Sequence, residues 1–197
     1  MLKPFINASL VLLYLGLIGC AGGPTNDASD NRVGIASSAD VDVEARVAYS
    51  RAVSLLQEGR TRSAMEQFAA ITQQYPNLAS AHVNLGILYL KQERYEDAQQ
   101  SLSKATQLRP DDAIAQNHLG IAYRQLGKFD EAKQAYAAAL QTNPQYANAH
   151  LNSGILYDIY LSELAQALRH YEQYKALING SDKQVDKWII DLKRRLK

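Results

Sequence analysis

One spacing constrains this chain more than any other feature: four kinds of residue recur every 34 positions in the sequence of 197 residues. The recurring positions are Gly86, Gly120 and Gly154; Tyr89, Tyr123 and Tyr157; Ala64, Ala98 and Ala132; and Pro76, Pro110 and Pro144. A period of this length, held by several residue types, is the signature of an architecture in which similar units pack only against their neighbours. The sequence therefore predicts a stack of repeated units.

Within a unit the apolar residues follow a helical period. The two apolar faces of one unit are Leu85, Leu88 and Tyr89, then Ala98, Leu102 and Ala105. Spacings of three and four residues are typical of amphipathic helices, so each unit is predicted to be a pair of helices joined by a short turn. Pro110 ends the second helix because proline has no N–H group and clashes with the preceding turn. Asp111 and Asp112 follow it and are expected to cap the next helix.

These residues resemble the tetratricopeptide repeat (TPR), a helix–turn–helix of 34 residues. The resemblance implies an all-α fold: an α–α superhelix of about four hairpins over 43–180, with a C-terminal capping helix over 181–197. The implied units are about 45–78, 79–112, 113–146 and 147–180. It also implies that Gly86 and its equivalents lie where the two helices of a hairpin approach too closely for a side chain, facing Ala98 and Ala132.

The fourth unit and the C-terminus depart from this pattern. One residue must be inserted after Tyr157 to place Ala167 and Tyr171, so we expect an irregular turn around 159–163. Ser181 and Gln184 fit a capping box that would start the last helix. The apolar stripe of that helix is Val185, Trp188, Ile189, Leu192 and Leu196. We therefore interpret Trp188 as a packing residue in a helix that covers the end of the stack.

The first twenty residues have the composition of an export signal. Lys3 precedes an apolar run over 8–19, which is shorter than the roughly 20 residues that a membrane-spanning helix needs. The run ends in Leu17-Ile18-Gly19-Cys20, which resembles the bacterial lipobox. The resemblance implies a signal peptide over 1–19, acylation of Cys20 (palmitate included) and a flexible tether over 20–42. An ordinary signal cleaved near Ala21 is the alternative.

Ala21, the residue after Cys20, also indicates a location. An Asp at this position retains enterobacteria-like lipoproteins in the inner membrane. The absence of an Asp here favours a lipid-anchored protein of the bacterial outer membrane that faces the periplasm. The polar stretch after Cys20 has no helical or alternating apolar period, which is typical of a linker.

Several function classes are disfavoured by the sequence. A net charge of +1 gives no general attraction to nucleic acid, and a single cysteine excludes an internal disulfide. The histidines are His82, His118, His150 and His170. His82 and His150 occupy equivalent positions two units apart, so they are not expected to meet, and we predict no metal site. The pairs Glu96-Asp97 and Asp130-Glu131 fit helix starts better than acid–base catalysis. No motif of an enzyme or a cofactor site is present, so we expect a non-enzymatic protein.

The TPR resemblance also implies a groove lined by the first helix of each unit. The candidate groove residues are Val83, Asn84, Ile87, Leu90, Asn117, His118, Ile121, Arg124, Leu151, Asn152, Ile155 and Asp158. A row of isoleucines in such a groove predicts binding of an amphipathic helix or an apolar peptide of a protein partner, with the asparagines and Arg124 holding its polar groups. The alternative is that these isoleucines are buried between neighbouring helices or are covered by the chain's own tether or last helix.

The resulting prediction is a lipid-anchored periplasmic adaptor that helps assemble an envelope complex. Lipidated TPR proteins of this build resemble the pilotins of type IV pilus biogenesis, which assist secretin rings. Pilotins typically carry about six repeats, whereas this chain has four. The alternatives are an adaptor for peptidoglycan enzymes, an adaptor for a TonB/ExbB-type energy-transduction system, and a self-associating structural lipoprotein. These alternatives leave the oligomeric state open.

Overall fold

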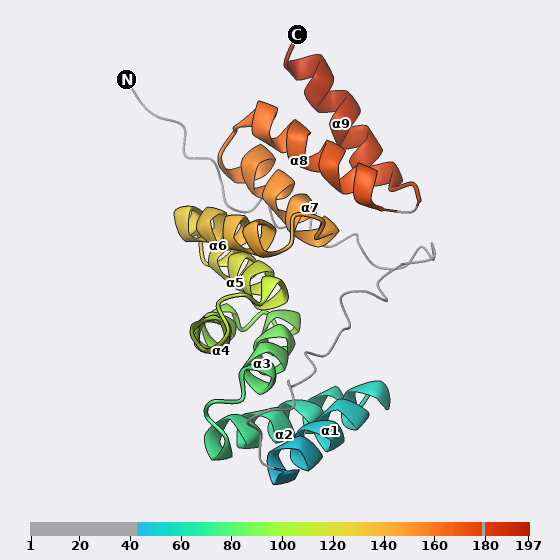
Figure 1. Ribbon diagram of the computed structural model, residues 1–197. Coiled ribbons are helices and arrows are strands. Elements are labelled where there is room, and N and C mark those ends of the chain that lie inside the picture. The colour runs from blue at the N-terminus through green and yellow to red at the C-terminus, as the bar shows by residue number, and fades with distance from the viewer. Residues whose placement is uncertain (1–42, 179) are drawn as a thin grey trace. The chain divides into compact units, whose positions relative to one another are not determined.

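The computed structural model describes residues 43–178 and 180–197, and the regular structure in these ranges is helical (Figure 1). The predicted signal peptide over 1–19, the lipidation of Cys20 and the tether over 20–42 lie outside the described residues.

Successive helices of the described ranges pair into four hairpins, followed by one more helix (Figure 1). The hairpins are α1 (Val43–Gln57) with α2 (Thr61–Gln74), α3 (Ala79–Lys91) with α4 (Tyr95–Leu108), α5 (Ala113–Gln125) with α6 (Phe129–Thr142), and α7 (Ala147–Ile155) and η3 (Leu156–Tyr160) with α8 (Leu164–Leu177). The last helix is α9 (Lys183–Arg195). The predicted all-α array of hairpins with a C-terminal helix is confirmed.

A glycine in the first helix sets the spacing of three of the hairpins. A Cβ atom added to Gly120 would lie 2.5 Å from the ring of Tyr136, and one added to Gly86 would lie 2.5 Å from Leu102. Gly154 has the same relation to Tyr171. The expectation of a close approach is therefore confirmed, but the group closest to each glycine is a large side chain of the second helix rather than the predicted alanine. Ala98 and Ala132 are nevertheless completely buried.

Neighbouring hairpins are joined by apolar clusters that include small residues. Val83 of α3, Ala105 of α4 and Ala115 of α5 form one buried cluster across two hairpins. Ala132 and Tyr136 of α6 pack with Leu156 of η3 in another. Because alanine lets helices approach closely, each hairpin buries its apolar surface against the next one.

The fourth hairpin accommodates its extra residue in a short π-helix. After α7 ends at Ile155, the chain forms the π-helix η3 over Leu156–Tyr160, and Ser162 then adopts a positive φ of 57°. A π-turn holds one more residue than an α-turn, which is how helices absorb an insertion. The irregular turn predicted around 159–163 is therefore present, and it begins a few residues earlier, at Leu156.

The predicted helix caps were right at one helix and wrong at another. The carboxylate of Asp112 accepts a hydrogen bond from the backbone N–H of Ala115, so the predicted cap of α5 is confirmed. The cap of α9 is Asp182, whose side chain accepts hydrogen bonds from the N–H groups of Gln184 and Val185. The predicted capping box on Ser181 was wrong by one residue, because the aspartate carboxylate one position later reaches two N–H groups.

Helix α9 covers the last hairpin with one face. Val185, Ile189 and Leu192 are buried in a cluster with Ala167 and Tyr171 of α8. The ring of Trp188 lies 5.2 Å from that of Tyr171, in agreement with the interpretation of Trp188 as a packing residue. None of the helices in the described ranges has the length and apolar character of a membrane span.

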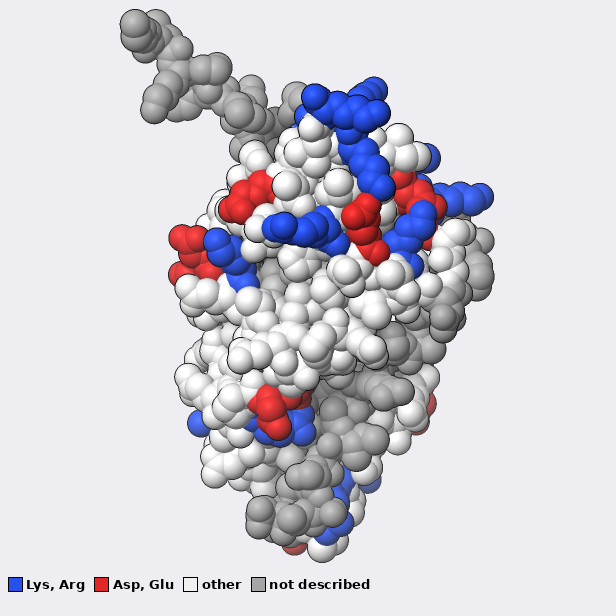
Figure 2. Space-filling view, turned by 45° about the horizontal axis from the view of Figure 1, so that its top comes forward, with Lys and Arg blue, Asp and Glu red and all other residues white. Residues whose placement is uncertain are grey.

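The outer face of α9 carries charges of both signs. In Figure 2 Lys and Arg (blue) and Asp and Glu (red) are mixed near the top of the molecule, whereas the middle of the side in view is mostly white. Ion pairs link α9 to its neighbours: Lys175 with Asp186, Lys193 with Glu172 at 2.7 Å, and Arg195 with Asp158 at 3.4 Å. Exposed pairs of this kind contribute little stability each, so the buried face holds α9 in place.

Candidate partner-binding surface

The twelve candidate groove residues lie on α3, α5, α7 and η3, and they fall into two groups by burial. Four are buried: Val83, Asn84, Asn117 and His118. Eight are half-buried: Ile87, Leu90, Ile121, Arg124, Leu151, Asn152, Ile155 and Asp158. The structure therefore leaves only the second group with surface that a partner could contact directly.

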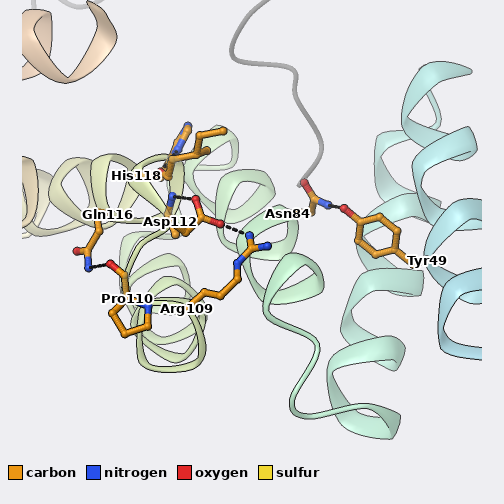
Figure 3. A network of polar contacts seen from close by, with 9 residues as sticks. Tyr49, Asn84, Arg109, Pro110, Asp112, Gln116 and His118 are labelled. Carbon is orange, nitrogen blue, oxygen red and sulfur yellow. Dashed lines mark hydrogen bonds and ion pairs between the residues drawn. The ribbon is translucent and has the colours of Figure 1, made fainter. Parts of the chain in front are cut away.

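Two asparagines of the set form hydrogen bonds to the first helix of the preceding hairpin. The amide of Asn84 donates a hydrogen bond of 2.7 Å to the hydroxyl of Tyr49, and the two side chains point toward one another in Figure 3. In the last hairpin, Asn152 donates to the Oδ1 atom of Asn117 at 3.0 Å. Within the described residues these amides hold α1 to α3 and α5 to α7, whereas the sequence pattern predicts that Asn84 and Asn152 hold a partner's backbone.

The two charged members of the set also have partners within the chain. The guanidinium of Arg124 lies 3.4 Å from the Tyr136 hydroxyl and 5.7 Å from the centre of the Tyr160 ring. Asp158 pairs with Arg195 of α9, while its burial raises the pKa of its carboxyl group above the usual value. These contacts connect the last two hairpins and α9, so either charge would have to leave its partner to bind another protein.

The apolar members form a row that is covered at its C-terminal end. Leu151 and Ile155 pack against the cluster that contains α9. Ile87 packs beside Val83, and Ile121 packs beside Tyr136, yet both isoleucines keep part of their surface exposed. The half-exposed apolar surface of α3 and α5, made by Ile87, Leu90 and Ile121, is called the isoleucine row below.

A repeated contact that sequence reasoning missed joins the first helix of the second, third and fourth hairpins to the proline that precedes it. The Nε2 atom of His82 lies 3.0 Å from the Pro76 carbonyl, Nε2 of Gln116 lies 3.4 Å from that of Pro110, and Nε2 of His150 lies 3.0 Å from that of Pro144. Because a carbonyl oxygen only accepts, each side chain is the donor. The signal was available in the sequence, since each of these residues follows its proline by six positions.

Burial of His82 has an electrostatic consequence. Loss of solvent lowers the pKa of its imidazole below the ordinary value of 6.5, and nearby Lys104 acts in the same direction. The hydrogen bond to the Pro76 carbonyl acts in the opposite direction, but the effect of burial is larger.

A second histidine contact was also missed. His82 and His150 do lie in different hairpins, but Nδ1 of His150 lies 3.1 Å from Nδ1 of His170 on α8. The ring of Tyr157 stacks on His170 with centroids 5.5 Å apart. Burial, His150 and Arg169 lower the pKa of His170 to about 4, so this imidazole is neutral at neutral pH.

A cavity of about 350 Å³ opens beside His170, between α6, α7 and α8. Tyr157, Ser153 and Lys133 are among the residues that line it. In the described ranges no group of three or more His, Cys, Asp or Glu side chains is arranged to hold a metal ion.

Comparison with protein families gives a consistent result along the chain. Two models, each described as tetratricopeptide repeat, match it: one over residues 83–147 and 119–181, the other over 46–78. The matched ranges contain most of α1 to α8. No curated protein matches the chain.

Solved structures with the same fold include several MamA proteins. A crystal structure of MamA is 22% identical, with a TM-score of 0.67, over 80% of this chain and 86% of that one. MamA from Desulfovibrio magneticus RS-1 is 16% identical, with a TM-score of 0.69, over 80% and 88%. TTC0263, a thermophilic TPR protein of Thermus thermophilus, is 21% identical, with a TM-score of 0.61, over 77% and 82%. At these identities the likeness shows the fold.

Proposed function

We propose that this chain, which belongs to the tetratricopeptide repeat family, binds its protein partner through the isoleucine row of α3 and α5. Repeats of this family serve as scaffolds for protein–protein interaction and are typically non-enzymatic. The observation that carries the proposal is that Ile87, Leu90 and Ile121 keep exposed surface on first helices while the polar candidates beside them bind within the chain. A partner here is recognised by apolar contact, as in the docking of an amphipathic helix.

We propose further that the chain is tethered to a membrane through a lipid on Cys20, in the bacterial outer membrane and facing the periplasm. The support is the lipobox-like sequence Leu17-Ile18-Gly19-Cys20. A tethered scaffold raises the local concentration of its partner at the membrane, which strengthens binding without new contacts. The complex that this scaffold helps assemble would lie in the cell envelope. Pilus and secretin machinery is the first candidate, and peptidoglycan enzymes or a TonB/ExbB-type system are the alternatives.

The test of the docking surface places a photo-crosslinking residue at Ile87 or Ile121. Ile159 of η3, 60% exposed, is the matched apolar control. We expect a crosslinked partner from both positions of the isoleucine row and none from Ile159. Equal crosslinking at all three positions, or none at any, would exclude the isoleucine row as the binding surface.

The test of the anchor is the variant Cys20→Ser. We expect the wild-type chain to fractionate with outer membranes and the variant to be released, because acylation needs the thiol. Retention of the variant in the membrane fraction would contradict a lipid anchor at this position.

A second candidate function, self-association of the chain, is supported by exposed apolar side chains. α1 and α9 expose large apolar side chains at opposite ends of the described chain, Val43 and Val47 on α1 and Ile190 on α9. Contact between two copies through these ends would give a self-associating structural protein. Size-exclusion chromatography at several concentrations separates it from the adaptor: concentration-dependent elution that Ile190→Ser abolishes favours self-association.

A further inference from the structure

The contact between His150 and His170 has the geometry of two ligands of one metal ion. Their Nδ1 atoms face each other at 3.1 Å, one from α7 and one from α8. Metal–nitrogen bonds to imidazole are about 2.0–2.1 Å long, so two nitrogens at this separation subtend an angle of roughly 100° at a shared ion. This value lies between the right angle of square-planar sites and the tetrahedral angle.

One of the two rings is already fixed in the state that a ligand needs. Nε2 of His150 donates to the Pro144 carbonyl at 3.0 Å, so the ring hydrogen is on Nε2 and the lone pair on Nδ1 points toward His170. A metal-binding histidine is usually oriented in this way, by a hydrogen bond from its other nitrogen to a carbonyl or carboxylate. The Tyr157 ring, stacked on His170, restricts the second imidazole.

We propose that His150 and His170 form a two-imidazole site for a borderline divalent cation, Zn²⁺ or Cu²⁺. Without metal, His170 donates its Nδ1 hydrogen to Nδ1 of His150. On binding, that hydrogen moves to Nε2 of His170, both Nδ1 atoms coordinate the ion, and the number of bound protons is unchanged. Imidazole nitrogen suits both cations, and the general order of affinity places Cu²⁺ above Zn²⁺.

The remaining coordination positions would be filled by small ligands. Of the two rings, that of His170 lines the cavity of about 350 Å³, which has room for such ligands on its side of the site. Lys133 lines the same cavity and Arg169 adjoins His170, so both positive charges would oppose the cation itself and favour an anion such as hydroxide, chloride or a carboxylate beside it. The Ser153 hydroxyl, which also lines the cavity, donates its hydrogen to the Ala149 carbonyl and keeps its lone pairs.

The repeat itself supplies the control variants. The positions equivalent to His150 and His170 are His82 and Ser101 in the second unit, and Gln116 and Ala135 in the third. His150→Gln and His170→Ser therefore introduce side chains that the same fold already accepts at the same packing positions. His82→Gln makes the first of these changes in a unit that lacks the second histidine.

The experiment titrates the full chain, produced without a polyhistidine tag, with ZnCl₂ by isothermal calorimetry. We expect a Zn²⁺ site in the wild-type chain, lost or weakened at least tenfold in His150→Gln and in His170→Ser, and unchanged in His82→Gln. With Cu²⁺, electron paramagnetic resonance should show coordination by two imidazole nitrogens that falls to one or none in each variant of the pair.

Circular dichroism of the three variants checks that they remain folded. The proposal is overturned if the wild-type chain takes up no Zn²⁺ or Cu²⁺, or if folded His170→Ser binds either ion as tightly as the wild type. Equal loss in His82→Gln would also overturn it, because the affinity would then come from histidines in general.

Discussion

The third and fourth hairpins make the same contact between their two helices but join the helices with different backbone conformations. In the third, α5 ends at Gln125, a short turn follows and α6 begins at Phe129. In the fourth, α7 ends at Ile155 and continues into the π-helix η3 before α8 begins at Leu164. Both hairpins place a glycine against a buried tyrosine, Gly120 on Tyr136 and Gly154 on Tyr171. The contact between the helices is therefore retained while the turn that joins them varies.

A left-handed residue in each turn locates the inserted residue. Positive φ angles occur at Gly59, Glu93 and Gly127, which are 34 positions apart, and then at Ser162. A regular fourth turn would have placed this residue at 161. The extra residue therefore lies before Ser162, within η3, and the second helix regains its register once the turn is complete.

The largest expected effect comes from filling the space at the glycines. Gly120→Ala should lower the free energy of unfolding by about 3 kcal/mol, because its Cβ would lie 2.5 Å from a ring that is 1% exposed. Gly154→Ala should cost less, because the adjoining π-turn gives the backbone more room to shift. Chemical denaturation of both variants measures the difference.

Gly127→Ala is the control for this experiment, since nothing lies within 4 Å of an added Cβ there and only the positive φ opposes it. Its cost should be about 1 kcal/mol. If Gly120→Ala costs no more than Gly127→Ala, the close contact with Tyr136 does not set the hairpin spacing.

The second largest effect on stability is expected in α9, the helix that packs on the fourth hairpin and has no equivalent on the third. Ile189 is 7% exposed and its neighbour Ile190 is 68% exposed. Ile189→Ala should destabilise the chain by about 2–3 kcal/mol, because it leaves a cavity against Tyr171 and Ala167. Ile190→Ala, the same change on the outer face, should stay within about 0.5 kcal/mol of the wild type. Similar losses in the two variants would show that α9 does not cover the array through this face.

Much of this arrangement was predictable from the sequence because glycine, alanine, tyrosine and proline recur with the packing. The period predicts the hairpins, and the extra residue before Ala167 predicts the irregular turn. The π-helix itself was not predictable, since an insertion of one residue fits a longer loop equally well. The structure shows its first residue, Leu156, packed with Tyr136 and Ala132.

The candidate surface was less predictable than the fold. The repeat predicts which positions line the groove, but the partners of the polar side chains depend on pairs of positions on different helices. Asn84 meets Tyr49, and Arg124 meets Tyr160, because the stacking of hairpins brings these atoms together, whereas Arg124 meets Tyr136 within one hairpin. His150 and His170 likewise meet across a hairpin that contains the inserted residue.

The third effect is a dependence on pH that differs between hairpins. His82 and Gln116 donate to equivalent proline carbonyls, but only His82 titrates. The pKa of His82 is lower in the folded chain than its ordinary value of 6.5, so the unfolded chain binds the proton more readily. Stability from this residue is present above pH 6.5 and is lost as the pH falls below it.

His82→Gln should remove this contribution while keeping the hydrogen bond to Pro76. Thermal melting of both proteins from about pH 7.5 to about pH 5 measures the effect, and the wild-type melting temperature should fall more steeply. Parallel curves would mean that His82 titrates alike in the folded and unfolded chains.

The smallest effect tests the turns themselves. Glu93 and Ser162 hold positive φ angles of 59° and 57° that favour glycine, and the first and third hairpins already have glycine at this position. Glu93→Gly and Ser162→Gly should each stabilise the chain by about 0.5–1 kcal/mol, measured by urea denaturation. The gain should be equal if the turns are equivalent despite the insertion. A gain at Glu93 with a loss at Ser162 would instead show that the serine side chain stabilises the turn that follows the π-helix.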